Sequence, residues 1–482
     1  MVMFYPVPDF VPALPEIVLS AAILVIVLID AFLPEAYRAV TYRLSLAALA
    51  LTGYAAYAVS AADVRLTFEG AFVADAMSDA LKIAICALGG LIFLYSRDYL
   101  REIRLFKGEF YVICLLGILG MMIMTSAHSL LTVYLGLELL SFSLYALTAM
   151  RRDDGRASEA AMKYFVLGAL ASGLLLYGLS MVYGATGHLE LAAIADAIAE
   201  VDAERALILV FGLVFVVVGV AFKLGAVPFH MWVPDVYQGA PVVVTMFISS
   251  APKLAAFALA MRLLVEAMGA LSEHWAQMLL VLAVLSFIIG NVVAIAQHNI
   301  KRMLAYSTIA HVGFIVMGVL SGNGEGYAAA MFYVITYALM ATAGFAVLTL
   351  LSRNGEECET LDHIKGMNQR YPWLAFLMLL VMFSMAGVPP TVGFYAKLLV
   401  LQSVVGAGLL PLAIAAVVFS VIGAFYYLRV VKLMYFDSAE QDAAVIAPST
   451  SAQTALSINA LGLLALGLFP AALMQVCVNA LG

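Results

Sequence analysis

The sequence predicts an all-α polytopic membrane protein of about fourteen transmembrane helices. Hydrophobic residues make up 65% of the 482 positions and charged residues only 11%, whereas soluble domains carry about 25% charged residues. Apolar runs of about 20 residues, each long enough to cross the ~30 Å hydrocarbon core of a bilayer, recur along the whole chain. Several of these runs contain a buried charge, and two are interrupted by prolines.

The apolar runs are separated by short polar connections. In chain order, the predicted spans cover residues 16–33, 42–60, 75–96, 110–127, 129–150, 158–184, 206–228, 240–264, 277–297, 303–320, 326–351, 372–403, 408–430 and 452–478.

The basic residues in the connections predict the orientation of the spans. On one side the connections hold Arg38, Arg43, Arg97, Arg101, Arg104, Lys107, Arg151, Arg152, Arg156, Lys301, Arg302, Arg353, Lys365, Arg370, Arg429 and Lys432. On the other side they hold only Arg65, Arg205 and Arg262. Because basic loops stay on the cytoplasmic side, we expect both termini on the outer, periplasmic side.

Five lysines that are not in the connections fall inside predicted spans, and we single them out together with one deep acid; the set is Lys82, Glu138, Lys163, Lys223, Lys253 and Lys397. A charge at the membrane centre costs about 2.5–3.5 kcal/mol, which packing alone gives no reason to accept. All the basic members of the set are lysines. A buried lysine can release its proton near neutral pH and an arginine cannot, so the set predicts a proton relay.

A structural role is the alternative, in which each lysine pairs with an acid or extends to the membrane surface. We favour it for Lys82, which lies near a span end with Asp79 one turn away. For Lys163, close to the inner end of its span, both roles stay open. The relay is the better interpretation for the three deep lysines and for Glu138, which we take as the only deep acid.

His230 and His311 lie in or beside spans and could carry a proton at neutral pH. A neutral hydrogen-bonding role is equally compatible with their positions. The four cysteines are scattered without any C-x-x-C spacing, so we expect no metal or iron–sulfur site in this chain.

Prolines break two of the predicted helices. Pro228 cannot donate to the carbonyl of Leu224, beside Lys223, and Pro389 and Pro390 free the carbonyls of Met385 and Ala386, ahead of Lys397. Free backbone groups at membrane depth are tolerated only inside protein or against water, so both breaks should line a hydrated path.

The similar pieces GAVP at 225–228 and GVP at 387–389 suggest two five-helix repeats, although a chance match of two kinks stays possible. An odd number of helices per repeat inverts the second copy. We therefore divide the chain into an N-terminal three-helix segment (1–109), a first repeat (110–268), a second, inverted repeat (277–435) and a C-terminal helix (450–482).

Three motifs resemble the antiporter-like subunits of respiratory complex I. They are FKLGAVPFHMWVPDVYQGAP at 222–241, NIKRMLAYSTIAH at 299–311 and YLGLEL at 134–139. The span count, Lys397 and the lack of a long C-terminal helix look like the N-type subunits, because M-type relatives typically carry glutamate at that lysine and L-type relatives are longer. The doubled proline at 389–390 departs from the single proline expected in many relatives.

The resemblance implies a non-redox subunit of the NADH-quinone oxidoreductase of the bacterial inner membrane. It would translocate protons while other subunits pass electrons from NADH to quinone. Glu138 and Lys223 would form an ion pair, Lys253 would be the central relay, and Lys397 would face the outer exit. Lys163 matches a further lysine of the family. Flavin, iron–sulfur clusters and quinone would belong to partner subunits. Expected partners are neighbouring antiporter-like and small membrane subunits and the lipid bilayer, and no nucleic acid.

Three other functions stay open. A subunit of a multi-subunit cation/proton antiporter would share the fold and the buried charges. A solute transporter would place a substrate pocket at the broken helices. A purely structural membrane anchor would give no reason for the deep charges.

Overall fold

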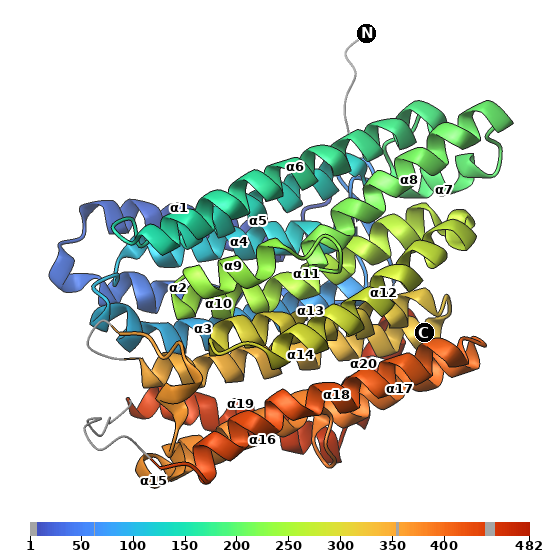
Figure 1. Cartoon of the computed structure of the whole chain (residues 1–482). Helices are drawn as coiled ribbons and strands as arrows, with labels where there is room; N and C mark the ends of the chain where they lie inside the picture. Colours follow the sequence, from blue (N-terminus) through green and yellow to red (C-terminus); the bar gives the residue numbers. More distant parts are fainter. Residues whose placement is uncertain (1–6, 62, 353–355, 439–448) are drawn as a thin grey trace.

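The computed structural model describes residues 7–61, 63–352, 356–438 and 449–482. Long helices dominate it and run side by side along one direction (Figure 1). Within the described residues, the strands are limited to one antiparallel hairpin of β1 (Arg65–Thr67) and β2 (Phe72–Ala74). The fold is therefore all-α, as the composition predicts.

The helices of the first half are α1 (Leu14–Phe32), η1 (Glu35–Tyr37), α2 (Ala39–Val59), α3 (Ala76–Glu102), α4 (Gly108–Thr125), α5 (Leu130–Thr148), α6 (Gly155–Thr186), α7 (Leu191–Ile198), α8 (Ala203–Leu224), α9 (Trp232–Gly239), α10 (Val242–Ser249), α11 (Ala251–Ala260) and η2 (Met261–Ala267). The second half contains η3 (Gly269–Leu271), α12 (Ser272–Ile295), α13 (Ile300–Leu320), α14 (Gly324–Leu351), η4 (Leu361–Ile364), α15 (Met367–Arg370), α16 (Pro372–Ala386), α17 (Val392–Gly406), α18 (Leu410–Tyr435), α19 (Thr450–Leu468) and α20 (Ala471–Leu481).

Twelve helices within the described ranges are long and apolar enough to cross a membrane. The set omits α2, and it omits α16 and α17 because each half of this broken helix is short. The polytopic membrane class is thus confirmed. The count of fourteen spans, the two inverted repeats and the four segments stay predictions.

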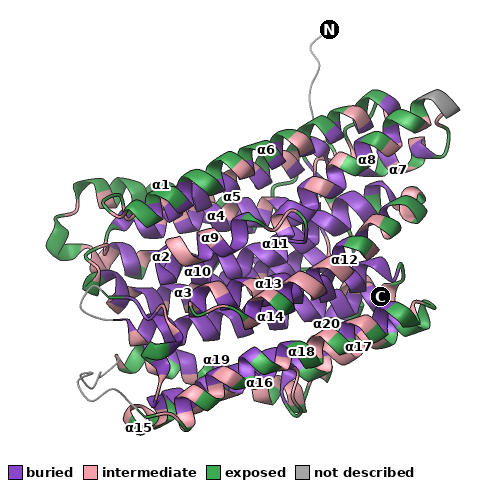
Figure 2. Cartoon of the chain, in the orientation of Figure 1, coloured by how far each residue is buried: buried purple, intermediate pink, exposed green. Residues whose placement is uncertain are grey.

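Burial separates the helices into an inner and an outer group (Figure 2). Residues 242–264 are all buried, and α13 and α14 are mostly buried. In contrast, α6, α8 and α18 expose many large apolar side chains. A membrane protein can expose apolar side chains because lipid surrounds them, so the charged residues that matter for function should gather on the inner group.

Two predicted spans are interrupted where we expected continuous helices. The span at 240–264 breaks at Ser250 into α10 and α11, because Pro252 cannot donate to the carbonyl of Ile248. The last span, 452–478, divides into α19 and α20 at Phe469 and Pro470. The first of these breaks lies directly before Lys253, where it affects the candidate site.

Candidate functional site

The first predicted break ends α8 at Leu224. Gly225 adopts the left-handed conformation, with φ of 83°, and its N–H donates to the carbonyls of Ala221 and Phe222. The Leu224 carbonyl, which Pro228 cannot reach, accepts a hydrogen bond of 2.9 Å from Lys253 Nζ. The freed carbonyl therefore binds a lysine, but it is Lys253 from α11, whereas the sequence had placed Lys223 beside it.

The second break repeats this geometry at the end of α16. Gly387 is left-handed, with φ of 87°, and its N–H donates to the carbonyls of Phe383 and Ser384. Lys397 Nζ, from α17, donates to the carbonyls of Met385 and Ala386 at 3.2 and 3.0 Å. These are the two carbonyls that the doubled proline frees.

Each break thus places an amine at the carboxyl end of a half-helix. Unpaired carbonyls give this end a partial negative charge, which favours a cation. Lys253 occupies it at the first break and Lys397 at the second. Lys397 lies on the helix that directly follows its break, whereas Lys253 lies on α11, a later helix. Both bind the carbonyl of the residue before the left-handed glycine.

Lys253 lies in the first turn of α11, directly after the break at Ser250 between α10 and α11. The sequence did not lead us to expect this third break. The Lys253 side chain is 1% exposed, and its ammonium lies 5.3 Å from the centre of the Trp232 ring, within range of a cation–π interaction. Lys223 and Lys253 line one cavity of about 10 Å³, about the volume that one water molecule needs. The motif Ser250-Ala251-Pro252 was the signal that could have revealed this break.

Glu138 and Lys223 do not form a direct ion pair within the described residues, contrary to what the resemblance implies. Lys223 Nζ donates to Ser141 Oγ at 2.6 Å. The Glu138 carboxylate accepts a short hydrogen bond from Ser172 on α6. Ser141 lies one helical turn after Glu138 on α5. The Lys223 amine therefore binds the Ser141 hydroxyl and makes no direct contact with the Glu138 carboxylate.

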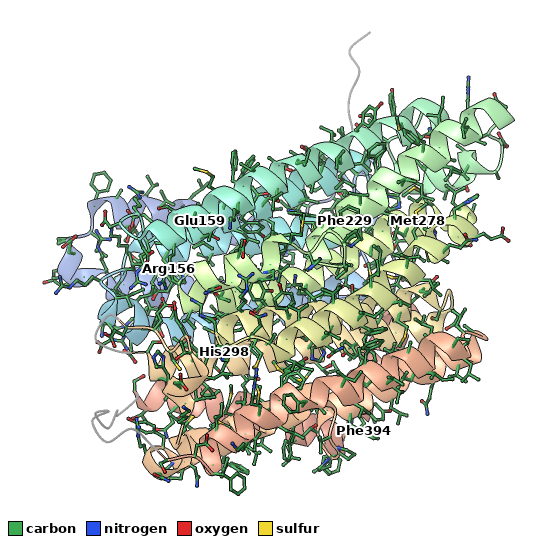
Figure 3. The ribbon with its side chains drawn as sticks, viewed as in Figure 1. Arg156, Glu159, Phe229, Met278, His298 and Phe394 are labelled. Atoms are coloured by element: carbon green, nitrogen blue, oxygen red, sulfur yellow. The ribbon has the colours of Figure 1, made fainter. Side chains whose placement is uncertain are left out.

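Lys163 is exposed and pairs with two acids. Its amine lies 2.8 Å from both Glu159 and Asp235, and Asp235 also binds Arg302 at 2.7 Å. Figure 3 shows Glu159 on α6, away from Phe229 and Phe394, which follow the first and second breaks. Lys163 therefore lies outside the group of buried lysines.

The two histidines have different environments. His230 is partly buried, and its Nδ1 has no hydrogen-bond partner among the described residues. His311 is buried and is hydrogen-bonded to the hydroxyls of Tyr333 and Tyr427, at 2.7 and 3.1 Å. His311 and Lys397 also line a second cavity of about 10 Å³, so this histidine belongs to the same site as Lys397.

Aromatic side chains lie near each of the two lysines. Trp232, which stands over Lys253, contacts Tyr237 with ring centres 6.5 Å apart. Further along, the ring of Tyr337 lies 4.9 Å from that of His311, and the elements that carry Tyr237 and His311, α9 and α13, pack together. Aromatic side chains thus lie beside Lys253 and beside His311, on helices that pack together.

Lys82 is fully buried and pairs with a residue that we did not expect. Its amine lies 2.9 Å from Glu16 on α1, whereas the sequence had suggested Asp79. Glu138 is therefore not the only buried acid. The acid on α1 could not be assigned from the sequence, because nothing local shows that α1 packs near Lys82.

Arg262 corrects the expectation that no arginine is buried. We had placed it in an outer connection, but it lies in η2 with 2% of its surface exposed. It binds Asp75 at 2.8 Å and Glu266 at 2.6 Å. Its positive charge is therefore fully compensated by these carboxylates.

Lys301 and Glu357 form a buried ion pair that the sequence analysis also missed. Lys301 Nζ donates to Glu357 at 2.8 Å and to the carbonyl of Ala240 at 2.7 Å. The hydroxyl of Tyr99 donates to the other carboxylate oxygen at 2.5 Å. Burial raises the pKa of Glu357, but the charge and hydrogen bonds of Lys301 and Tyr99 outweigh it and lower the pKa below its usual value. Hydrogen bonds to Glu357 thus link α3, through Tyr99, and α13, through Lys301, to the segment after α14. These residues lie on the side of the membrane that we expect to be the inner side.

Comparisons with known proteins agree with this geometry. A family model described as NADH:quinone oxidoreductase/Mrp antiporter, transmembrane, matches residues 127–423. NADH-quinone oxidoreductase subunit N of Thioalkalivibrio sulfidiphilus is 56% identical over 479 residues, covering 99% of this chain and all of the relative. The subunit N of Thiobacillus denitrificans is 56% identical over 474 residues, covering 98% of each chain.

Solved structures share the fold. A chain of respiratory complex I from Thermus thermophilus with bound aureothin is 31% identical, with a TM-score of 0.83, over 97% of this chain and all of that one. A chain of the Mrp complex from Dietzia has a TM-score of 0.86 over 98% and 97% of the two chains, but its 18% identity shows the fold alone. The chain therefore belongs to the subunit N family of the NADH-quinone oxidoreductases.

Proposed function

We propose that this chain is the proton-translocating, non-redox subunit N of a bacterial NADH-quinone oxidoreductase. The observation that carries the proposal is the pair of broken helices, each with a lysine on its freed carbonyls, Lys253 buried and Lys397 half-buried. A lysine at such a site can gain or lose a proton without leaving it, because the carbonyls accept hydrogen bonds from either form of the amine.

The relay would consist of Glu138, Lys223, Lys253 and Lys397, with His311 as a link. Lys223 and Lys253 line one cavity, and two neighbouring ammonium groups repel each other, so protonation of one favours release from the other. The released proton would pass between the packed helices α9 and α13 to His311 and then to Lys397. From Lys397 it would leave on the outer side, toward which α17 runs.

Glu138 would set the charge state of Lys223 from a distance. In the structure the Lys223 amine donates a hydrogen bond to Ser141. A small movement of this amine toward the Glu138 carboxylate would form the Glu138–Lys223 ion pair that the family resemblance implies. Such a change would switch Lys223 between holding and releasing a proton. Lys163 and His230 are left outside the relay.

The surroundings of the chain are part of the same proposal. We infer that it lies in the bacterial inner membrane, with both termini outside, as the basic connections suggest. The named relatives support other subunits of the oxidoreductase as partners. We infer that these include neighbouring antiporter-like subunits and small membrane subunits. Flavin, iron–sulfur clusters and quinone would be bound by those partners and not by this chain.

Purification of the tagged chain from its native membrane tests the proposal. We expect it to bring down flavin-containing subunits, and we expect the purified complex in liposomes to take up protons when NADH and quinone are added. The rival function, an antiporter subunit, predicts cation-driven proton exchange without NADH. Such exchange, with no NADH-oxidising partner, would overturn the proposal.

A further inference from the structure

His311 is hydrogen-bonded on both sides to buried hydroxyl groups that the proposed relay does not use. Its Nδ1 lies 2.7 Å from the hydroxyl of Tyr333 on α14, and its Nε2 lies 3.1 Å from the hydroxyl of Tyr427 on α18. The Tyr427 hydroxyl is also hydrogen-bonded to Ser307, one helical turn before His311 on α13. All four side chains are buried.

The hydroxyls on the Nε2 side lead to a fixed acceptor, Asn291 on α12. The amide nitrogen of Asn291 donates to the carbonyl of Phe287 at 2.9 Å, so the amide oxygen is left to accept. The Tyr426 hydroxyl donates to this oxygen at 3.3 Å. It also interacts with the hydroxyls of Tyr427 and Ser307, both of which can donate to its oxygen. Each hydroxyl proton on this side therefore has an acceptor.

The Nδ1 side has no such acceptor. Among the described residues, the hydroxyl of Tyr333 has a single hydrogen-bond partner, which is Nδ1 of His311. A neutral imidazole has one N–H donor and one acceptor nitrogen. If Nδ1 carried the proton, it would donate to Tyr333, and the Tyr333 O–H would be buried without an acceptor, which is costly. If Nε2 carries the proton, Tyr333 donates to Nδ1 and no donor is left over.

The imidazole itself is neutral in this environment. Its two hydrogen-bond partners are uncharged hydroxyls, and no carboxylate contacts it in the part of the chain that the structure describes. A buried charge without an opposite charge is expensive, so the choice lies between the two neutral tautomers. The hydrogen bonds decide it in favour of the Nε2–H form.

We propose that Tyr333 and Tyr427 hold His311 in the Nε2–H tautomer, so that the histidine takes up a proton at Nδ1 and releases one from Nε2. Release occurs on the side of Lys397, because Lys397, His311 and Tyr427 line one cavity of about 10 Å³, about the volume that one water molecule needs. The two tyrosines are positioning residues, since they act through the histidine.

The protons balance in this step. Tyr333 passes its hydroxyl proton to Nδ1 and takes the incoming proton in its place. The Nε2 proton leaves, through a water molecule in the cavity, to the amine of Lys397 in its neutral form. The imidazole is neutral before and after the step. This role in pumping rests on the proposed function, whereas the tautomer is a property of the resting complex and is measured without turnover.

Infrared spectroscopy of the purified complex, without NADH, measures the tautomer, because ring-stretching bands of histidine differ between the Nδ1–H and Nε2–H forms. Growth on ring-labelled histidine isolates the histidine bands, and subtraction of the spectrum of His311→Gln isolates those of His311. We expect the parent complex to show the Nε2–H form. A parent complex that shows the Nδ1–H form or an imidazolium would overturn the proposal.

The two tyrosines should respond differently to substitution by phenylalanine. Tyr427→Phe removes the acceptor of the Nε2 proton, so each tautomer then leaves one donor unpaired and both forms should appear. Tyr333→Phe removes only the donor to Nδ1, so the Nε2–H form should persist. A tautomer change in Tyr333→Phe but not in Tyr427→Phe would overturn the assignment. If Tyr427→Phe does not assemble, the spectra of the parent and of Tyr333→Phe still decide.

Proton uptake into inverted vesicles tests the role of the tautomer in pumping. Tyr427→Phe should slow NADH-driven uptake several-fold in a complex that assembles on a native gel. The control is Tyr95→Phe, at a buried tyrosine of α3, which should pump normally. Normal pumping by an assembled Tyr427→Phe complex with both tautomers would overturn the positioning role. A parent complex that does not pump would instead overturn the proposed function and leave the tautomer result standing.

Discussion

Replacing Lys397 by methionine separates a relay role from a structural role. The change removes the hydrogen bonds to the carbonyls of Met385 and Ala386, and each unsatisfied carbonyl costs about 1–3 kcal/mol. It also removes a charge whose burial costs about 2.5–3.5 kcal/mol. The two effects largely cancel, so the net loss of stability should be at most about 3.5 kcal/mol. The complex should assemble, yet it should not pump protons.

The assay is NADH-driven proton uptake into inverted membrane vesicles, with assembly checked on a native gel. Lys432→Met is the matched control, because Lys432 is an exposed lysine on α18 and its loss should leave pumping unchanged. An assembled Lys397→Met complex that pumps at the normal rate would refute the assignment. A complex that fails to assemble would show that Lys397 is needed for the fold.

The remaining predictions concern the inner ion pair and the second break. Lys301→Met should cost up to about 3–5 kcal/mol, because it leaves the buried Glu357 with only Arg151, at 3.4 Å, as a cation. The double variant with Glu357→Gln should cost less than the sum, and additive losses in denaturant unfolding would contradict the coupling. Because the pKa of Glu357 is lowered by folding, its contribution should be complete above about pH 4.5 and lost as the pH falls through the lower folded value; a flat acid profile would argue against it. Gly387→Ala should cost about 1–2 kcal/mol through its left-handed backbone and should slow pumping, since the new Cβ would lie 3.0 Å from Lys397 Cδ; normal pumping would show that this lysine tolerates displacement.

Much of the fold follows from local sequence signals. Apolar runs mark the spans because each must cover the hydrocarbon core, and the prolines at 228 and 389–390 mark breaks because they remove specific N–H donors. The carbonyls of Met385 and Ala386 could be named in advance for this reason. Pro252 carried the same signal for the third break, and it was overlooked because the surrounding run is apolar throughout.

The partners of the buried charges could not be predicted in the same way. Lys82 pairs with Glu16, which is distant in sequence, and Lys301 pairs with Glu357 across two helices. Such pairs depend on how helices pack, and a single sequence contains no measure of packing between distant spans. The same limit explains why the freed carbonyl of Leu224 binds Lys253 from a later helix and not its neighbour in the chain.

The substitution Lys223→Arg tests the relay most directly. Arginine keeps the positive charge and can still donate to Ser141, but it cannot release a proton. The measurement is NADH-driven proton uptake into inverted vesicles, with Lys223→Ala beside it and assembly verified on a native gel. The relay predicts that the assembled arginine variant pumps nearly as poorly as the alanine variant. Near-normal pumping by the arginine variant would show that position 223 needs only a charge, and the central claim would be contradicted.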